Sequence, residues 1–268
     1  TAYIKNAAVQ GSMINMLLEV YSRTGNATYY EYAVKTADFL ISNFHDVVYG
    51  GFYRTYNQSC GQPQDTGKGI EDSYGQVSYG LLKLYELTRN STYLNLSKEA
   101  MDFTINHLWD SIYGGWLTEV DRTGGVIIND RKYPNEEIWP VFGGFAYYYK
   151  ITGNLTALDY ACKTMDYIDS KLWDPVYGGW FRSLWRNNTI RDDTKTAWDL
   201  AGEPWMIWEV YKMTGNITYQ GMARKGLDWV LNTVMYDTVY GGVVTEVDRT
   251  GTTITDSAKD VEVESDAI

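Results

Sequence analysis

Residues 46–51 read Asp-Val-Val-Tyr-Gly-Gly, and the pattern Asp-x-Val/Ile-Tyr-Gly-Gly occurs four times in this chain of 268 residues. Its tyrosines are Tyr49, Tyr113, Tyr177 and Tyr240, at intervals of 64, 64 and 63 residues. Self-similarity at a fixed period is the sequence signature of a repeat architecture. The chain is therefore expected to consist of four repeated units of similar length.

A second marker, Thr-Gly-Asn or Thr-Arg-Asn, keeps the same period at residues 24–26, 88–90, 152–154 and 214–216. On either side of it lie segments such as 8–21 and 29–40, in which apolar residues recur at three- and four-residue steps, as on one face of a helix. Residues 118–124 and 245–251 share Thr-Glu-Val-Asp-Arg-Thr-Gly, which is typical of a strand followed by a tight turn. The pattern predicts an all-α fold, a helical-hairpin toroid or solenoid with short β hairpins on one face.

The predicted units cover approximately residues 1–64, 65–128, 129–191 and 192–255, within one continuous domain. Residues 256–260 then repeat the pattern that opens the second and fourth units, so the chain enters a fifth unit. Three explanations stand. The chain is a fragment of a longer repeat protein, or it is a four-unit array whose acidic tail covers one end, since terminal repeats are atypical. In the third, the tail at 261–268 reaches into a neighbouring copy and links subunits.

Composition narrows the function classes. The net charge of −11, with no basic stripe, disfavours a nucleic-acid surface, and no apolar run is long enough to span a membrane. The two cysteines, Cys60 and Cys162, do not make a disulfide framework, and the two histidines lie far apart. Neither a metal site nor a cofactor is indicated by the sequence.

Seven Asn-x-Ser/Thr sequons occur along the chain, and four of them occupy the same predicted turn in every unit. The seven asparagines are Asn26, Asn57, Asn90, Asn95, Asn154, Asn187 and Asn216. An asparagine in that turn can also cap the next helix, but capping does not require the Ser or Thr two residues later. The pattern predicts N-glycosylation and an extracellular or cell-surface location.

Aromatic residues are abundant, with 24 Tyr and 10 Trp. Most aromatic side chains at helical spacing belong to the core, because they bury large areas against neighbouring helices. Those in loops and at helix starts could instead stack on the C–H face of a pyranose ring. The candidates for binding a carbohydrate are Trp116, Trp139, Trp180, Trp198 and Trp205.

The segments 149–154 and 211–216, Tyr-x-x-Thr-Gly-Asn, together with the Tyr-Gly-Gly-Trp turns at 113–116 and 177–180, carry a family resemblance. The chain resembles the (α/α) toroids of the N-acylglucosamine 2-epimerase and cellobiose epimerase superfamily and its six-hairpin glycosidase relatives. The resemblance spans the whole chain and implies a carbohydrate ligand. Those epimerases use inward-facing histidines, whereas His45 and His107 stand at the ends of second helices. Hydrolysis is therefore favoured over epimerisation.

Carboxylates remain as catalytic candidates, because glycoside hydrolysis needs a protonated acid and an ionised base or nucleophile across a cleft. Acidic residues gather at the predicted starts of the first helices, including Glu71, Glu137 and Glu203. Asp72 and Glu136 both lie 18 positions before the asparagine of the second marker (90 − 72 and 154 − 136). The adjacent aspartates at 192 and 193 resemble the aspartate pair of six-hairpin mannanases. The predicted catalytic residues are Asp72, Glu136, Asp192, Asp193 and Asp199.

The same residues have a structural interpretation, since acidic side chains in a first turn complement the helix dipole. Lys5, Lys68, Lys132 and Lys195 recur at the unit starts, where a salt bridge is expected. Two hypotheses follow. One is a carbohydrate-active toroid, in which case the chain is a glycoside hydrolase. The other is a non-catalytic surface glycoprotein that acts as a structural or assembly module.

Overall fold

The computed structural model describes residues 3–259, except for the side chains of Asp72 and Ala201. Its main elements are four helical hairpins: α1 (Ala7–Thr24) with α2 (Ala27–Phe44), α3 (Gln76–Thr88) with α4 (Ser91–His107), α6 (Tyr147–Thr152) with α7 (Leu155–Tyr167), and α8 (Glu203–Thr214) with α9 (Ile217–Leu231). The predicted helical-hairpin fold is confirmed. The predicted tail at 261–268 lies outside the described residues.

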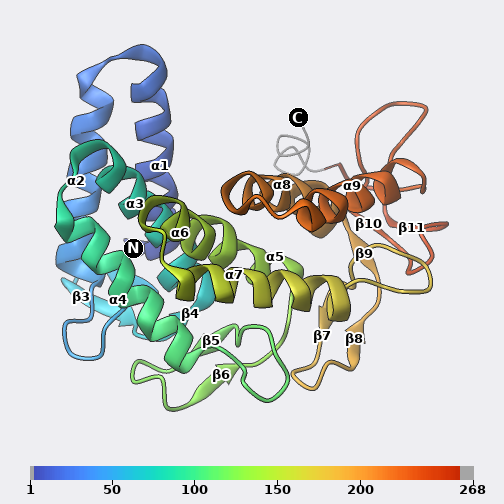
Figure 1. Ribbon diagram of the computed structural model, residues 1–268, viewed down its shortest axis with the longest axis horizontal. Coiled ribbons are helices and arrows are strands. Elements are labelled where there is room, and N and C mark those ends of the chain that lie inside the picture. Colours follow the sequence, from blue (N-terminus) through green and yellow to red (C-terminus); the bar gives the residue numbers. More distant parts are fainter. Residues whose placement is uncertain (1–2, 260–268) are drawn as a thin grey trace.

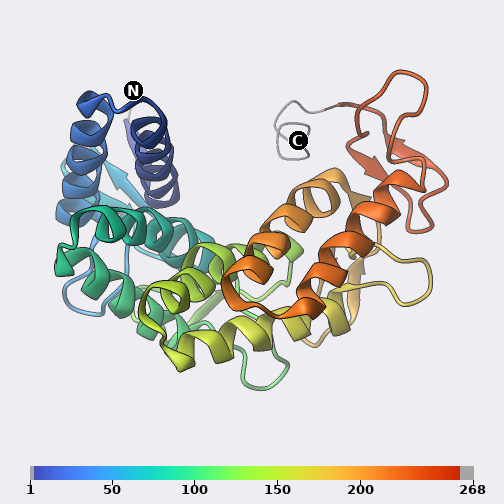
Figure 2. The same ribbon diagram turned by 45° about the horizontal axis from the view of Figure 1, so that its top comes forward.

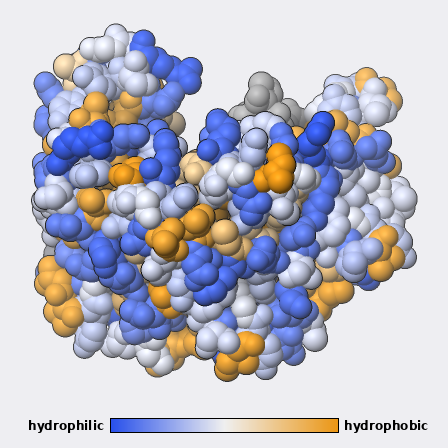
Figure 3. Space-filling view, in the orientation of Figure 1, coloured by the Kyte–Doolittle hydropathy of each residue, from blue (hydrophilic) through white to orange (hydrophobic). Residues whose placement is uncertain are grey.

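The hairpins follow one another along an arc (Figures 1 and 2). Helices α1, α3, α6 and α8 form its inner row, in which each contacts the next, and α2, α4, α7 and α9 lie on the outer side. The space-filling view shows the opening of the arc as a deep indentation beside the limb formed by α1 and α2 (Figure 3). The inner row therefore presents a concave wall.

Short antiparallel strands lie along one edge of the arc, at the starts of the inner helices (Figure 1). In three units the strand that opens the unit pairs with the hairpin that ends it. These sheets are β1 (Ile4–Asn6) with β2 (Thr55–Asn57) and β3 (Gln62–Asp65); β4 (Lys68–Gly69) with β5 (Glu119–Val120) and β6 (Ile127–Asn129); and β9 (Lys195–Thr196) with β10 (Glu246–Val247) and β11 (Ile254–Asp256). In the third unit the hairpin consists of β7 (Ser183–Leu184) and β8 (Ile190–Asp192). It pairs with the start of that unit through one backbone bridge, between Leu184 and Lys132.

Three inner helices include π-helical turns near their starts: η1 (Glu71–Gly75), η2 (Pro140–Ala146), which follows α5 (Pro134–Trp139), and η4 (Trp198–Gly202). In η1 the Gln76 N–H donates to the Glu71 carbonyl, five residues back. A fourth π-helical turn, η3 (Ile168–Leu172), ends the outer helix of the third unit. Such turns bulge the helix and are frequent at functional sites. The sequence pattern gave no indication of them.

The glycines and the aspartate of each Asp-x-x-Tyr-Gly-Gly turn hold the backbone and join neighbouring units. Both glycines of each turn have φ between about +70° and +81°, where other residues are strained. Asp174 accepts from the backbone N–H groups of the turn, and its carboxylate also meets Lys195 and Arg249. Asp46 and Asp110 have the same set of partners from the same places in the repeat. The predicted salt bridges are thus present for Lys68, Lys132 and Lys195, whereas Lys5 lies over the Phe39 ring.

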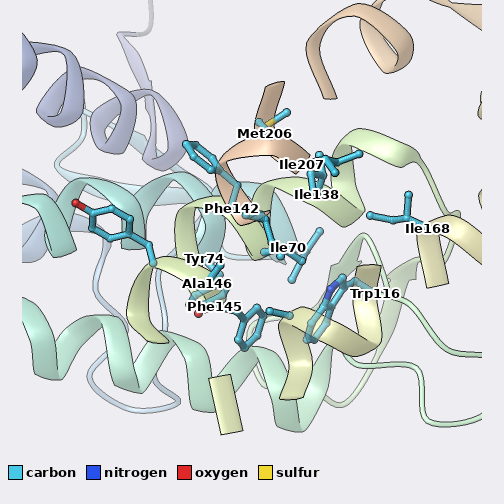
Figure 4. Packing of buried hydrophobic residues seen from close by; sticks show 14 of the residues in the cluster. Ile70, Tyr74, Trp116, Ile138, Phe142, Phe145, Ala146, Ile168, Met206 and Ile207 are labelled. Carbon is cyan, nitrogen blue, oxygen red and sulfur yellow. The ribbon is translucent and has the colours of Figure 1, made fainter. Parts of the chain in front are cut away.

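The core lies between the inner and outer rows (Figure 4). Trp116 stacks on Phe145 with ring centroids 5.1 Å apart, and its indole N–H donates to the Thr164 hydroxyl. Trp180 occupies the equivalent place in the third unit and is also fully buried. Among the described residues, no helix has the length and apolar character needed to cross a bilayer.

Candidate functional site

A cavity of about 380 Å³ lies on the concave wall where the inner helices of the second, third and fourth units begin. Its lining combines three carboxyl groups with aromatic rings and one guanidinium. The lining residues are Glu71, Gln76, Tyr133, Asn135, Trp139, Arg182, Thr196, Trp198, Asp199, Gly202, Glu203 and Met206. The size and the mixed lining are typical of a small-molecule site.

The repeat itself explains why these residues converge. Counting forward from the buried lysine of each unit, the third residue lines the cavity in all three units: Glu71, Asn135 and Trp198. The fourth residue is acidic in the same three units: Asp72, Glu136 and Asp199. The first unit has Ala8 and Val9 at these places, so it supplies no carboxyl group there.

Asp199 is a buried carboxyl group of the cavity with a strongly raised pKa. It is 5% exposed, and its carboxylate accepts a hydrogen bond of 2.5 Å from the Thr196 hydroxyl. Burial raises the pKa of Asp199 to about 7, although the Thr196 hydrogen bond and the positive charge of Arg182 oppose the shift. Asp199 can therefore hold a proton at neutral pH, as a general acid must.

Glu71 begins the π-helical turn η1 of the second unit, lines the same cavity as Asp199 and is only partly buried. The Gln76 side-chain amide donates to Glu71 over 2.8 Å, and the Ser12 hydroxyl donates to the Gln76 carbonyl oxygen over 2.7 Å. Helix α1 thus helps to hold Gln76 and, through it, Glu71. Glu203, at the start of α8, is buried and is the third carboxyl group of the lining.

Comparisons with known proteins agree with this architecture. The sequence profile described as glycosyl hydrolase family 76 matches residues 1–133. No curated protein is significantly similar to the chain in sequence. Among solved structures, a cellobiose 2-epimerase from Bacillus thermoamylovorans superposes with a TM-score of 0.82 at 16% identity, over 93% of this chain and 66% of its own. The chain therefore shares the (α/α) toroid fold of these proteins.

Two further solved toroids are mannanases. A family 76 α-mannanase from Bacteroides thetaiotaomicron has a TM-score of 0.71 at 17% identity, over 96% of this chain and 65% of its own. An inactive variant of an α-1,6-mannanase from Salegentibacter, with two adjacent aspartates replaced by alanine, is a complex with α-1,6-mannotetraose. Its TM-score is 0.67 at 16% identity, over 90% of this chain and 64% of its own. The chain thus spans about two thirds of the length of each.

The toroid places the predicted tryptophans in two environments. Trp139 and Trp198 line the cavity, and Trp205 is 49% exposed beside it, packed edge-on against Phe142. Trp116 and Trp180 are 1% and 0% exposed, so neither can stack on a ligand. They turn inward because Trp116 and Trp180 pair through backbone bridges with Trp109 and Trp173, which fixes the side on which the rings lie.

The remaining predicted carboxylates do not form one group. The side chain of Asp72 lies outside the described part of the structure, and Glu136 is in the first turn of α5, beside the lining residue Asn135. Asp192 accepts from the backbone and hydroxyl of Thr194, and Asp193 is half exposed, 3.9 Å from Arg249. The pair at 192 and 193 does not line the cavity.

Glu137 is a second buried carboxyl group with a raised pKa, but its partners are structural. Both of its oxygens accept from the Trp116 backbone N–H. Burial raises the pKa of Glu137 to about 7 against the attraction of Lys132. This carboxyl group ties α5 to the Tyr-Gly-Gly turn at Tyr113 and is closed off from the cavity.

Neither histidine belongs to the cavity. His45 contacts the Glu99 carboxylate at 2.7 Å, and His107 lies against the Phe103 ring with its Nδ1 3.3 Å from the Gly124 carbonyl oxygen. Both follow or end outer helices. The concave wall therefore lacks the acid–base histidines that the resemblance associates with epimerisation.

The sequons occupy three kinds of position in the toroid. Asn26, Asn90, Asn154 and Asn216 cap the second helices through their side-chain oxygens. Asn57 and Asn187 lie in β hairpins, at the end of a strand and in a turn. Asn95 lies within α4, where its partner Ser97 is fully buried. Capping uses only the side-chain oxygen of each asparagine. The side-chain nitrogen, to which an N-linked glycan is attached, is not used by the cap.

Several lining residues were given no role by the sequence, among them Glu71, Glu203, Tyr133 and Arg182. Aligning the units on their recurring lysines, Lys68, Lys132 and Lys195, would have related these positions to one another. The distance from the lysine to the Thr of the second marker is 20 residues in the second and third units (88 − 68, 152 − 132) but 19 in the fourth (214 − 195). Counting back from the asparagine therefore misses the equivalence of Asp199 with Asp72 and Glu136.

Proposed function

We propose that the chain is the site-bearing part of a carbohydrate-active toroid that hydrolyses glycosidic bonds with carboxyl groups of the concave cavity. The observation that carries the proposal is the pairing of Asp199, which is buried and able to keep a proton near neutral pH, with the more accessible Glu71 in one aromatic-lined cavity. Two carboxyl groups in different protonation states are what glycoside hydrolysis requires.

The family match supports a catalytic role for the acidic residues at the start of the second unit's inner helix. Residues 1–133 include the adjacent acids Glu71 and Asp72 but exclude Asp192 and Asp193. A solved toroid lost its activity when two adjacent aspartates were replaced. We therefore assign the adjacent acid pair of this chain to 71 and 72, at the start of its inner helix, and not to 192 and 193.

In this mechanism Asp199 donates its proton to the glycosidic oxygen as the bond to the anomeric carbon breaks. A carboxylate of the pair at 71 and 72 acts on the anomeric carbon, either through an activated water or directly as nucleophile. Trp139 and Trp198 hold the sugar rings by stacking. Arg182, 3.9 Å from Asp192 and paired with Glu246, borders the cavity as a fixed charge.

The test is turnover of α-1,6-linked mannotetraose, with cellobiose as a probe of epimerisation. Asp199→Asn and Glu71→Gln should each lower kcat/KM by about 100-fold or more, the usual contribution of general acid–base catalysis. Asp193→Asn, an exposed carboxylate outside the cavity, is the matched control and should retain activity. The proposal is contradicted if Asp199→Asn and Glu71→Gln both keep full turnover, or if the product is an epimer.

A second candidate function is a surface glycoprotein module. It is favoured by the four turn sequons, which lie at equivalent places in all hairpins and expose their capping asparagines at least in part. Intact-mass measurement on native material tests it, since occupied sequons add masses in hexose or N-acetylhexosamine steps. A single unmodified mass would remove this alternative and would leave the hydrolase proposal untouched.

A further inference from the structure

The β7–β8 hairpin departs from the turn design of its counterparts. In the second unit Asp121 closes the turn by accepting from the backbone N–H groups of Gly125 and Val126, and Asp248 does the same in the fourth unit. The segment Asp-Arg-Thr-Gly at 121–124 and 248–251 becomes Trp-Arg-Asn-Asn at 185–188. Only the arginine is kept, and it pairs with the aspartate of the preceding unit in all three hairpins.

The two asparagines contribute to the turn and its support, since the Asn187 side-chain oxygen accepts from the Thr189 N–H. The Trp185 side chain offers no oxygen to the turn, and it is 47% exposed. Asn188 takes a left-handed conformation at φ +65°, a place that glycine holds in the other two hairpins. Asparagine tolerates this region less well than glycine does. The Arg191 guanidinium lies over the Trp185 ring, 5.5 Å from its centroid, and the rest of the ring is open to a ligand.

The tip of the hairpin is nonetheless held firmly. The Asn188 amide donates to the Tyr113 carbonyl over 2.9 Å and accepts from the Tyr167 hydroxyl over 2.7 Å. Arg186 binds the buried Asp110 carboxylate through two nitrogens. Trp185 is therefore presented on a fixed support, which lowers the entropy lost when a ligand binds.

A surface cavity of about 430 Å³ lies beside this ring, lined by Tyr113, Asp130, Trp185, Arg186 and Asn187. Within residues 3–259 the Asp130 side chain makes no hydrogen bond or ion pair, and the Asn187 side-chain nitrogen donates no hydrogen bond. The Asn187 oxygen is already taken by Thr189. The cavity thus offers an aromatic face, a carboxylate acceptor and an amide donor.

We propose that this cavity is a carbohydrate-binding platform, separate from the concave cavity, in which Trp185 stacks on a neutral pyranose ring. The hydroxyl groups of the sugar pair with Asp130 and with the Asn187 amide. An anionic ligand is disfavoured, because the Arg186 guanidinium is engaged by Asp110 and the Asp130 charge faces the cavity. The pyranose comes either from a free oligosaccharide or from a glycan on Asn187, two residues along the same turn. In the second case the Asn187 nitrogen carries the glycan, and the sugar hydroxyls pair with Asp130.

The first arm of the test uses unmodified protein from a host without N-glycosylation, in the Asp199→Asn background so that no probe is cleaved. The Trp185 indole N–H signal, identified by its loss in Trp185→Asp, is followed by NMR during titration with α-1,6-mannotetraose, cellotetraose and chitotetraose. The expected result is a saturable shift of the Trp185 signal by at least one probe. The shift should persist in Trp198→Ala, which alters only the concave cavity, so failure here is distinct from failure of the hydrolase proposal.

The second arm uses protein from a host that glycosylates sequons, with occupancy of Asn187 read from the intact mass. If the platform holds this glycan, Trp185→Asp lowers Tm in the glycosylated form but not in the unmodified form. Trp185→Asp restores the residue of the other two hairpins and should leave the Tm of the unmodified chain within about 2 °C. A fall of more than about 4 °C there would make Trp185 a packing residue and overturn the proposal. It is equally overturned by an unmoved Trp185 signal together with an unchanged Tm of the glycoprotein; where Asn187 is unoccupied, the first arm decides alone.

Discussion

At the scale of single residues, Asp199 combines burial with a place in the lining of the concave cavity, whereas Glu137, which is also buried, does not line it. Desolvation disfavours the charged form of Asp199 and raises its pKa to about 7, and the Thr196 hydroxyl and Arg182 only partly offset this. Asp193, in contrast, is half exposed on the hairpin edge. The environment, and not the residue type, decides which carboxyl group can act as an acid.

The pH dependence of stability tests this environment without a substrate. A carboxyl group with a folded-state pKa of about 7, raised from 3.8, contributes stability that is fully present below the unfolded value and is lost as pH rises through about 7. Asp199→Asn removes that loss. The variant should therefore gain stability relative to the parent between pH 5 and pH 8.5 in urea unfolding. A difference that stays constant over this range contradicts the raised pKa, and Asp193→Asn serves as the control.

The same group predicts the pH profile of the proposed hydrolysis. Because Asp199 must be protonated to act as the acid, kcat/KM should fall above about pH 7. In Thr196→Val the hydrogen bond that favours the ionised form is lost, so this limb should move to higher pH. Initial rates between pH 4 and 9 measure both. If the pH at which kcat/KM falls is the same in Thr196→Val and in the parent, Thr196 does not influence the pKa of Asp199.

At the scale of elements, the junctions between units depend on one buried aspartate each. The positive charges of Lys195 and Arg249 help to hold the pKa of Asp174 down at about 2, so its stabilising contribution is present above pH 4 and lost as pH falls toward 2. Asp174→Asn leaves a buried lysine without its counter-charge, and we expect a loss of about 3 kcal/mol in the free energy of unfolding. Chemical unfolding at pH 7 measures it.

Asp237 provides the matched control for this junction. It has the same place in the motif and a lysine partner, Lys259, but is partly exposed and has no arginine partner among the described residues. Asp237→Asn should therefore destabilise the chain much less than Asp174→Asn. Equal losses would show that the buried triad adds nothing beyond the turn hydrogen bonds that both aspartates make.

Two glycines separate backbone strain from packing at the same junctions. Gly178 and Gly241 both have φ +74°, so alanine at either place costs about 1 kcal/mol of backbone strain. A Cβ at Gly178 would also lie 2.6 Å from the Trp229 ring, whereas none of the described atoms lies within 4 Å of one at Gly241. Gly178→Ala should thus lose roughly 1–3 kcal/mol more than Gly241→Ala in urea unfolding. Similar losses would show that Trp229 moves aside freely.

The elements also show how far sequence alone could go. Period, turn glycines and amphipathic segments predicted the hairpins, and Asp199, Trp139 and Trp198 were predicted residues that line the cavity. The π-helical turns and the inward side of Trp116 could not be predicted, because tertiary packing fixes both. One extra residue per π turn changes which side chains face the wall. Glu71 and Glu203 were therefore seen as acidic helix starts but not as lining residues.

At the scale of the whole molecule, the first unit contributes to a cavity that it does not line. Its helix α1 approaches α3 closely at Gly11 and Gly80, where a Cβ on either residue would meet backbone atoms of the other helix within 3 Å. This contact brings the Ser12 hydroxyl to Gln76, which in turn holds Glu71. Neighbouring repeats thus act on the site through packing and one chain of hydrogen bonds.

Ser12→Ala tests that long-range support. Loss of the hydroxyl frees the Gln76 side chain, so the carboxylate of Glu71 is less fixed and kcat/KM should fall by about three- to tenfold, the effect of roughly 1 kcal/mol in positioning. Tm should change by less than about 2 °C, because Ser12 is exposed. Ser22→Ala is the matched control: it lies on the same helix and its hydroxyl donates only to the Glu19 carbonyl. If both variants turn over mannotetraose equally fast, the first unit supports the fold but not the position of Glu71.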